Sequence, residues 1–554
     1  MRRQRRRRIN PFLGLFLFLV SVTFLPAACW AALASVRRLS EPQPPTLVIA
    51  YSPEKQHLFE ELLSGFASVE RRTSTGRRMQ VKAVPLPSEK MIGAAIAGEV
   101  QAVCTDSSLW LASIDEEWLR QNPGAGPLVG QSVRFAISPV VIATRAEVAR
   151  ALGYPGRRLG WADIIERART DPSFGWSHAS TSTASGLLAT LAQFYAGAGK
   201  TRGLTVEDVT SEAVLQYVAA VQATVKHYGE GELATVQRVL AEGDRSGLAA
   251  FVVQEQLVIY LNQHSEQKFV AIYPKEGTLW EDHPLALLEL PQLDSEARET
   301  FEAFARYLRG EQAQKVVLRH GYRPADLHIP LVGEESPFTP ANGVDPAQPE
   351  TTLQVPSPAV VAVVRDVWWY TKKHTNVFLV VDTSGSMEGP KIEAARAALQ
   401  AFLTGIRGEV ERVGLVEFGS EIKRVVPLAE LSRNRAALEA AVAELEVGGS
   451  TAFLDAVSYA YSALQRMRDS SRINAVVAMT DGRENASELT LRGLLAQVRD
   501  GNARGVPVYI FCIAYGSDAD LKLLERIAAE SGGQTYRGDE TSLEDLYKAI
   551  STYF

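Results

Sequence analysis

Three oxygen-bearing side chains alternate along one short segment that follows an apolar run. Residues 377–381 read Val-Phe-Leu-Val-Val and lead directly into Asp382, Ser384 and Ser386. In an extended loop, residues two apart point the same way, so these three oxygens can converge on one small, hard cation. The apolar run has the pattern of a buried central strand, which would deliver the oxygens to its C-terminal tip. The spacing suits Mg²⁺ or Mn²⁺.

Two further segments could complete such a site. A Gly-Gly-Ser-Thr run ends at Thr451 and opens an expected helix, and a second apolar run over 476–480 ends on Asp481. An alternative is that Asp382 and Asp481 only cap the helices that follow, since Asp is a preferred N-cap residue. With only two anionic groups, a bound ion would keep a position for water or for a partner's oxygen. These segments offer no general base or nucleophile beside the ion, which indicates a binding device and not an enzyme.

This set of residues resembles the metal-ion-dependent adhesion site of the von Willebrand factor A family, which uses Asp-x-Ser-x-Ser, a distant Thr and a distant Asp. The matching positions, in order, are Asp382, Ser384, Ser386, Thr451 and Asp481. The resemblance implies a Rossmann-like, doubly wound α/β domain over residues 371–554 with bound Mg²⁺ or Mn²⁺. It also implies a protein partner that offers an acidic side chain to the metal.

Alternating strand and helix patterns in this region agree with a parallel sheet. Besides the two apolar runs, strands are expected at 413–418 and 506–513. Helices are expected at 390–407, 433–445, 452–468, 489–503, 521–530 and 543–553.

The first half of the chain shows another βαβ alternation, with strands expected at 47–51 and 81–84 and helices at 54–68 and 88–98. This half resembles the two-lobed solute-binding proteins of bacterial uptake systems. The segments that carry the resemblance are Ala50-Tyr51-Ser52, Asp106-Ser107-Ser108, and residues 135–142, 182–186 and 272–277.

The resemblance implies a type II periplasmic-binding-protein-like domain over 46–329. Lobe one would comprise 46–140 and 253–329, and lobe two 141–252. We expect crossing strands near 138–142 and 251–260, where apolar runs are long enough. The implied function is capture of a solute, and the alternative function for the whole chain is the substrate-binding receptor of an ABC importer.

Hydroxyl side chains would line the cleft between the lobes. The candidates are Ser52, Ser107, Ser108, Thr183 and Ser185. Hydroxyls and backbone amides at helix N-termini, with little fixed positive charge, suit a small oxyanion or polar solute. The same residues could instead be helix caps. His178 and Glu255 could also face the cleft, although a single His near a helix start is more often a hydrogen-bonded structural residue.

The N-terminus predicts a membrane segment. Six arginines within residues 1–8 precede an uncharged, apolar run over 11–33 that would span ~34 Å as a helix. The arginine excess places this end in the cytoplasm and the bulk of the chain outside, as a single-pass protein of the cell membrane. We favour a retained anchor over 1–45, with cleavage or lipidation at Cys29 as the alternative.

Composition bears on nucleic-acid binding, on disulfide bonds and on the linker between the domains. Without the six N-terminal arginines, 52 basic residues face 64 acidic ones, and the net charge of −12 makes nucleic acid an improbable partner. Three cysteines are too few and too scattered for a disulfide framework. Repeated prolines over 330–370 predict an extended linker between the two domains.

Overall fold

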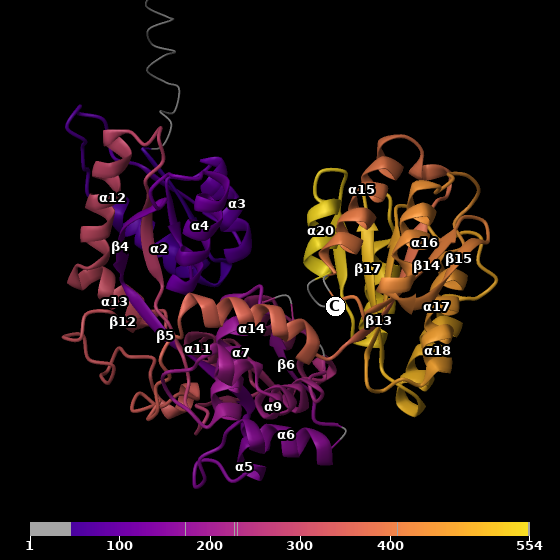
Figure 1. Cartoon of the computed structure of the whole chain (residues 1–554), viewed down its shortest axis with the longest axis horizontal. Coiled ribbons are helices and arrows are strands. Elements are labelled where there is room, and N and C mark those ends of the chain that lie inside the picture. Colours follow the sequence, from indigo (N-terminus) through magenta and orange to yellow (C-terminus); the bar gives the residue numbers. More distant parts are fainter. Residues whose placement is uncertain (1–45, 172, 227, 230, 407, 552–554) are drawn as a thin grey trace, which may run out of the picture.

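The computed structural model describes residues 46–171, 173–226, 228–229, 231–406 and 408–551. Figure 1 shows two lobes formed by the first part of the chain and a separate C-terminal domain that follows α14. The expected membrane segment, including Cys29, lies outside the described residues. Among the residues that are described, no helix has the length and apolar character needed to cross a membrane.

Lobe one contains a five-stranded sheet in the order β2-β1-β3-β11-β4, in which β1 pairs in parallel with β2 and β3. Its elements are β1 (Leu47–Tyr51), η1 (Pro53–Lys55), α2 (Gln56–Ala67), β2 (Val81–Pro85), α3 (Ser88–Ala97), β3 (Ala102–Cys104), α4 (Ser108–Gln121), β4 (Val129–Arg134), β11 (Pro284–Leu288), α12 (Ser295–Leu308) and α13 (Glu311–Arg319). Alternate residues of β1 face opposite sides of the sheet: Ile49 packs with Phe59 and Phe301, whereas Ala50 packs with Met91.

Lobe two contains a sheet in the order β10-β5-β8-β6-β7, with β9 and β12 also paired to β5. Its elements are β5 (Ala136–Arg145), α5 (Ala146–Ala151), α6 (Trp161–Thr170), β6 (Trp176–Ala179), α7 (Ala184–Ala198), α8 (Val206–Thr210), α9 (Glu212–Gln222), β7 (Tyr228–Gly229), α10 (Glu232–Glu242), η2 (Gly243–Ser246), β8 (Ala250–Gln254), α11 (Glu255–His264), β9 (Phe269–Ile272), β10 (Trp280–Glu281) and β12 (Arg323–Pro324).

The first crossing between the lobes lies where expected, but the second does not. β5 follows β4 directly and is the long strand predicted near 138–142. The apolar run at 257–260 lies in α11, and the chain stays in lobe two through β9 and β10, which both pair with β5. The chain returns to lobe one between Glu281 and Pro284, so lobe two extends well beyond the expected end at 252.

The proline-rich segment is not an extended linker. Phe338, Val344 and Leu353 are each at most 3% exposed, and the Ala271 amide donates to the Gly343 carbonyl at 2.7 Å. The segment includes η3 (Pro340–Asn342) and then forms α14 (Pro358–Thr371), which packs on α7, α8 and α9 of lobe two. Proline prevented regular structure over much of the stretch but did not prevent packing.

The C-terminal domain is a mixed α/β fold with a six-stranded sheet in the order β15-β14-β13-β16-β17-β18. Its elements are β13 (Thr375–Asp382), η4 (Gly385–Met387), α15 (Pro390–Gly405), β14 (Arg412–Phe418), β15 (Ile422–Glu430), α16 (Leu431–Ala443), α17 (Phe453–Met467), β16 (Ile473–Thr480), α18 (Leu491–Arg504), β17 (Val508–Tyr515), α19 (Leu521–Ser531), β18 (Thr535–Gly538) and α20 (Leu543–Ser551). All neighbours are parallel except β14 and β15. The edge strands β15 and β18 were not expected.

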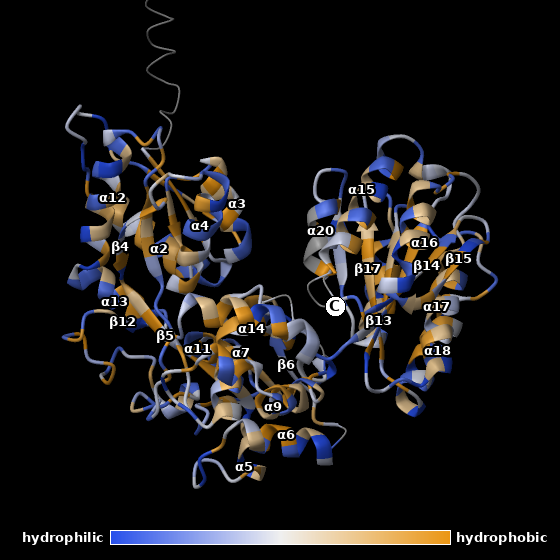
Figure 2. Ribbon diagram, viewed as in Figure 1, coloured by the Kyte–Doolittle hydropathy of each residue, from blue (hydrophilic) through white to orange (hydrophobic). Residues whose placement is uncertain are grey.

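Apolar residues concentrate on the central strands and on the inner sides of the helices, with polar residues outside (Figure 2). Alternate residues of β13 pack in two different hydrophobic cores. Leu379 lies on the face of the sheet covered by α15 and α20, and Val380 lies on the face covered by α17 and α18. The central strand is therefore buried on both faces, as its uninterrupted apolar run predicts.

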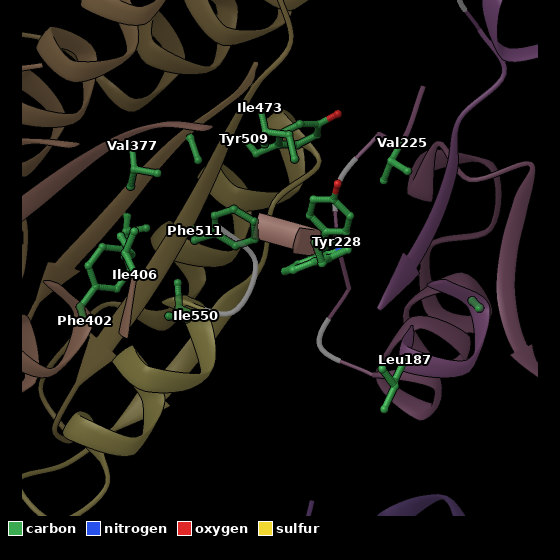
Figure 3. Close-up of a cluster of buried hydrophobic side chains, with 14 of the residues drawn as sticks. Leu187, Val225, Tyr228, Val377, Phe402, Ile406, Ile473, Tyr509, Phe511 and Ile550 are labelled. Atoms are coloured by element: carbon green, nitrogen blue, oxygen red, sulfur yellow. The ribbon is translucent and has the colours of Figure 1, made fainter. Parts of the chain in front are cut away.

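Lobe two and the C-terminal domain share one buried apolar cluster. Figure 3 shows side chains of lobe two, among them Tyr228, in the same cluster as Tyr509 and Phe511 of β17. The Tyr228 hydroxyl accepts a hydrogen bond from the Lys373 amide at 2.7 Å, and Arg238 Nη2 donates to the Gly532 carbonyl at 2.6 Å. The two domains are in contact through packed and hydrogen-bonded groups.

Candidate metal centre and the lobe interface

The five predicted metal ligands come together at the C-terminal edge of the C-terminal sheet. β13 and β16 are parallel neighbours, so Asp382 and Asp481 reach the same edge. The Gly385 amide donates to the Gly449 carbonyl at 3.0 Å, which joins the first loop to the loop before α17. A Cβ built on Gly482 would lie 3.0 Å from the Thr451 hydroxyl and 3.5 Å from the Ser386 hydroxyl.

Hydrogen bonds link most of these side chains. The Ser386 hydroxyl donates to Asp481 Oδ1 at 2.6 Å, and the hydroxyls of Ser384 and Ser386 lie 3.1 Å apart. Asp382 accepts from the Ser384 amide at 2.8 Å and from the Thr480 hydroxyl at 2.5 Å. Ser386 is exposed and the other four predicted ligands are at most 4% exposed, so the cluster opens to solvent at one point.

The loop before α17 needs glycine to approach this closely. Gly449 has φ +89°, in the left-handed region, and a Cβ there would lie 2.6 Å from the Ser420 hydroxyl. The Thr451 amide donates to Asn485 Oδ1 at 2.9 Å, which ties this loop to the segment after β16. The glycine pair therefore positions Thr451.

The charge of the cluster favours a cation. Burial raises the pKa of Asp382; hydrogen bonds from Thr480 and Ser384 oppose this rise, and the negative charge of Asp481 adds to it. Lys391 of α15 places its ammonium group 2.5 Å from Asp481 Oδ2, so one cation already lies at the edge of the cluster. Two carboxylates and three hydroxyl groups are the kind of oxygen donor set that a hard divalent ion prefers, and the attracted ammonium group shows that the cluster draws a positive charge.

The hydroxyl residues predicted for the cleft do not act alike. Ser107 and Thr183 are N-caps, since each accepts a hydrogen bond from a backbone amide of the helix that follows. Ser108 is exposed, and its amide donates to Asp282 at 2.7 Å. Of the five predicted residues, only Ser52 bonds through its side chain to an ionisable group at the lobe interface, since its hydroxyl donates to Asp106 Oδ1 at 2.5 Å. Ser185 is buried, but its hydroxyl has no hydrogen-bond partner among the described residues.

Ionisable side chains, not hydroxyls alone, fill the interface between the lobes. This acidic cluster consists of Glu54, Lys55, Asp106, Glu232, Glu281 and His283. Glu54 is partly buried and each of the other five is at most 4% exposed. Burial is the main cause that raises the pKa of Glu232 to about 7 and that of Glu281 well above its ordinary value; other carboxylates of the cluster add to both shifts.

Neither His178 nor Glu255 belongs to this cluster. The ring nitrogens of His178 contact the Ala179 carbonyl at 2.7 Å and Gln222 Oε1 at 3.1 Å inside lobe two. Glu255 forms an ion pair with Arg323, with Nε 2.7 Å from Oε2. Both are structural residues.

Sequence reasoning missed most of the acidic cluster. Asp106 lies two residues after the short strand β3 and Asp382 ends β13, so a carboxylate at the C-terminal end of a strand is a usable signal. Glu281 and His283 lie in a segment that periodicity does not distinguish, and Lys55 and Glu232 sit at helix starts where charged residues are common. These residues lie close together because the chain crosses back to lobe one between Glu281 and Pro284. The sequence pattern predicted that crossing near 251–260.

Comparison with known proteins supports both halves of the fold. A family model described as bacterial extracellular solute-binding protein matches residues 47–323, and one described as von Willebrand factor type A domain matches residues 376–549. Inter-alpha-trypsin inhibitor heavy chain H4 of Sus scrofa is 32% identical over 196 residues, which are 34% of this chain and 21% of that protein. The Homo sapiens protein of that name is 28% identical over 190 residues, 32% of this chain and 20% of that protein. This chain thus spans about a fifth of the length of these relatives.

Solved structures resemble one half of the chain or the other. A von Willebrand factor type A protein from Catenulispora acidiphila is 22% identical, with a TM-score of 0.29, and the alignment covers 33% of this chain and 43% of that one. The sulfate-binding protein SubI from Mycobacterium tuberculosis H37Rv is 17% identical, with a TM-score of 0.36, and the alignment covers 51% and 87%. The solute-binding match spans half of the 554 residues, so the chain belongs to the bacterial extracellular solute-binding protein family and carries a C-terminal von Willebrand factor type A domain.

Proposed function

We propose that this chain is an exported binding protein, anchored in the cell membrane by its N-terminal segment, that engages a partner protein through Mg²⁺ or Mn²⁺ at the C-terminal domain. The observation that carries the proposal is the convergence of the five oxygen-bearing side chains at one sheet edge, with Ser386 open to solvent. The order and type of these residues match the adhesion site of the family that the domain resembles.

Each residue has a role in this proposal. Asp382 and Asp481 would supply the negative charge, and Ser384, Ser386 and Thr451 would supply neutral oxygens. A bound ion of this kind acts as a Lewis acid that accepts a further oxygen from a partner. The exposed side of the cluster is where an acidic side chain of another protein would reach the ion. The proposed activity is therefore binding, and no catalytic step is assigned to the chain.

Calorimetric titration of the full chain with Mg²⁺ tests the metal part of the proposal. The Asp382→Ala, Asp481→Ala double variant should lose Mg²⁺ binding, because both anionic groups are gone. The matched control is Asp518→Ala, which removes an exposed carboxylate from a loop at the same end of the domain and should leave the affinity unchanged. Equal affinity in the double variant and the wild-type chain would refute the proposal.

Retention of partners from the source cell envelope tests the adhesion part. The immobilised wild-type chain should retain its partner in Mg²⁺ and release it in EDTA, and the Asp382→Ala variant should not retain it. Partners that stay bound in EDTA and on the variant would show that the interaction does not use the ion.

We also propose that the first domain captures a small solute between its lobes. The support is its family membership together with polar side chains from both lobes that are buried at the lobe interface. A deletion strain that loses uptake of one solute would favour the receptor of an ABC importer, and normal uptake with lost surface assembly would favour the adhesion function.

A further inference from the structure

We propose that the acidic cluster is a second metal site, in which Asp106, Glu281 and His283 hold one divalent transition-metal ion between the two lobes. The proposal specifies the solute class of the first domain and so rests on the proposed solute capture. It is independent of the metal centre at β13. Lobe one supplies Asp106, and the crossing segment supplies the other two residues.

Glu281 lacks the partners that a buried carboxylate needs. It is 0% exposed, and neither of its carboxylate oxygens has a hydrogen-bond partner within the part of the chain that the structure describes. Buried carboxylates are costly unless a cation or several donors compensate them. A ligand that supplies positive charge at this position removes that cost.

His283 points to the same place. It is 0% exposed, and its Nδ1 lies 3.5 Å from Asp106 Oδ1, too far for a good hydrogen bond. Neither ring nitrogen has a hydrogen-bond partner among the described residues. The ring packs edge-on against Tyr322 with centroids 5.0 Å apart, which fixes its orientation. A neutral imidazole held in this way is a ready metal ligand.

The charges nearby leave room for a further cation. Lys55 is buried and pairs with Asp106, and its ammonium group also contacts Ser52. That pair leaves the carboxyl groups of Glu232 and Glu281 without a matching ammonium or guanidinium group among the six residues of the cluster, since Lys55 is its one such group. An oxyanion would add to the negative charge, so this interface does not suit the anion that the hydroxyl pattern predicts.

The size of the site favours a metal ion over an organic cation. One ligand atom from each of the three residues lies within 4.8 Å of the other two, and all three residues are buried. Metal–ligand bonds of about 2.0–2.2 Å can bring such atoms around a single ion. One imidazole with two carboxylates suits Mn²⁺, Fe²⁺, Co²⁺ or Zn²⁺, whereas Mg²⁺ prefers oxygen ligands alone.

Manganese bound to the full chain can distinguish this site from the other. The five ligands at β13 are all oxygens, so nitrogen hyperfine coupling in the pulsed EPR spectrum of bound Mn²⁺ would report on His283. We expect the wild-type chain to bind two Mn²⁺ ions. The Asp481→Ala variant should bind one Mn²⁺ ion, and its spectrum should show nitrogen coupling. In the Asp481→Ala background, His283→Gln should abolish the coupling and weaken the remaining binding at least tenfold, and Glu281→Gln should weaken it similarly.

The controls make every outcome decisive. His57→Gln changes an exposed histidine on α2 and should leave both ions and the coupling intact. Glu281→Gln preserves size and should fold even if His283→Gln does not, and unchanged Mn²⁺ affinity in a folded Glu281→Gln chain would overturn the proposal. One ion per wild-type chain without nitrogen coupling would also overturn it. The proposal would also be overturned if the metal-free chain bound sulfate and the Glu281→Gln variant bound it more tightly. In Asp382→Ala, loss of the ion at β13 alone is the expected result, and it agrees with both the proposed adhesion site and the proposed second metal site.

Discussion

Replacing Lys372 by Met should destabilise the junction between the two domains. Lys372 follows α14, and its Nζ lies 2.8 Å from Glu411 Oε1, with both side chains 0% exposed. Burial by itself raises the pKa of Glu411, but Lys372, His374 and Thr375 more than reverse this and lower it to about 2. Relative to an ordinary value near 4.5, that shift corresponds to about 3 kcal/mol of folding free energy, and burial, which lowers the pKa of Lys372, offsets part of it.

The sign of the pH dependence follows from the lowered pKa. In the wild-type chain, this stabilisation is fully present above about pH 4.5 and is lost as the pH falls toward 2. The Lys372→Met variant leaves a buried carboxylate without its cation, which should cost about 3–5 kcal/mol at pH 7. Burial then raises the pKa of Glu411, so the contribution of this group to stability should increase as the pH falls from 7 toward 5.

Urea unfolding at pH 7 and pH 5, followed by tryptophan fluorescence, measures both effects. Lys372 Nζ lies 5.9 and 5.4 Å from the ring centroids of Trp368 and Trp369, so these side chains report on the junction. Lys522→Met, an exposed change on α19, is the control and should alter stability by less than about 0.5 kcal/mol. Adding Glu411→Gln to Lys372→Met should recover part of the loss. A Lys372→Met chain as stable as the control at pH 7 would refute the reasoning.

Two further changes test the electrostatics of each domain. Lys391→Gln removes the ammonium group that contacts Asp481, and Mg²⁺ affinity measured by calorimetry should rise about fivefold, near 1 kcal/mol; weaker binding would show that Lys391 assists the site. Burial lowers the pKa of His178 to about 4. The unfolded chain therefore binds more protons between pH 6.5 and 4, and the wild-type chain should lose about 2–3 kcal/mol by pH 4.5. The free energy of unfolding of His178→Asn, measured with urea, should fall less than that of the wild-type chain between pH 6.5 and 4.5. An equal fall in both chains would show that other groups cause the effect.

The C-terminal domain could be predicted well because its signals are local. The strand that ends at Asp382 is an unbroken apolar run buried on both faces, and the polar residues follow it directly. Parallel pairing of β13 with β16 then brings the second carboxylate to the same edge. The edge strand β15 escaped prediction because its residues are mostly half-buried and its apolar side chains do not alternate regularly.

The lobe interface could not be predicted because its residues are brought together by the path of the chain. The run Leu-Val-Ile-Tyr at 257–260 is as apolar as a strand, but it follows Gln254 into α11, a helix buried over most of its surface. Short apolar runs do not distinguish buried helices from strands. The expected bounds, with that run as a crossing strand, put all of 253–329 in lobe one, and nothing in the sequence pattern marked Glu281 and His283 as interface residues.

The junction also changes how the two domains can influence each other. The extended connector that the prolines predicted would transmit little force between the domains. Instead, α14 packs on lobe two, and Arg365 of α14 lies over the Trp110 ring of lobe one at 4.8 Å. After three intervening residues the chain enters β13 at Thr375, and the far end of this strand carries Asp382. A helix that contacts both lobes thus continues almost directly into the strand that positions the metal centre, so a change in lobe closure has a short, packed route to that strand.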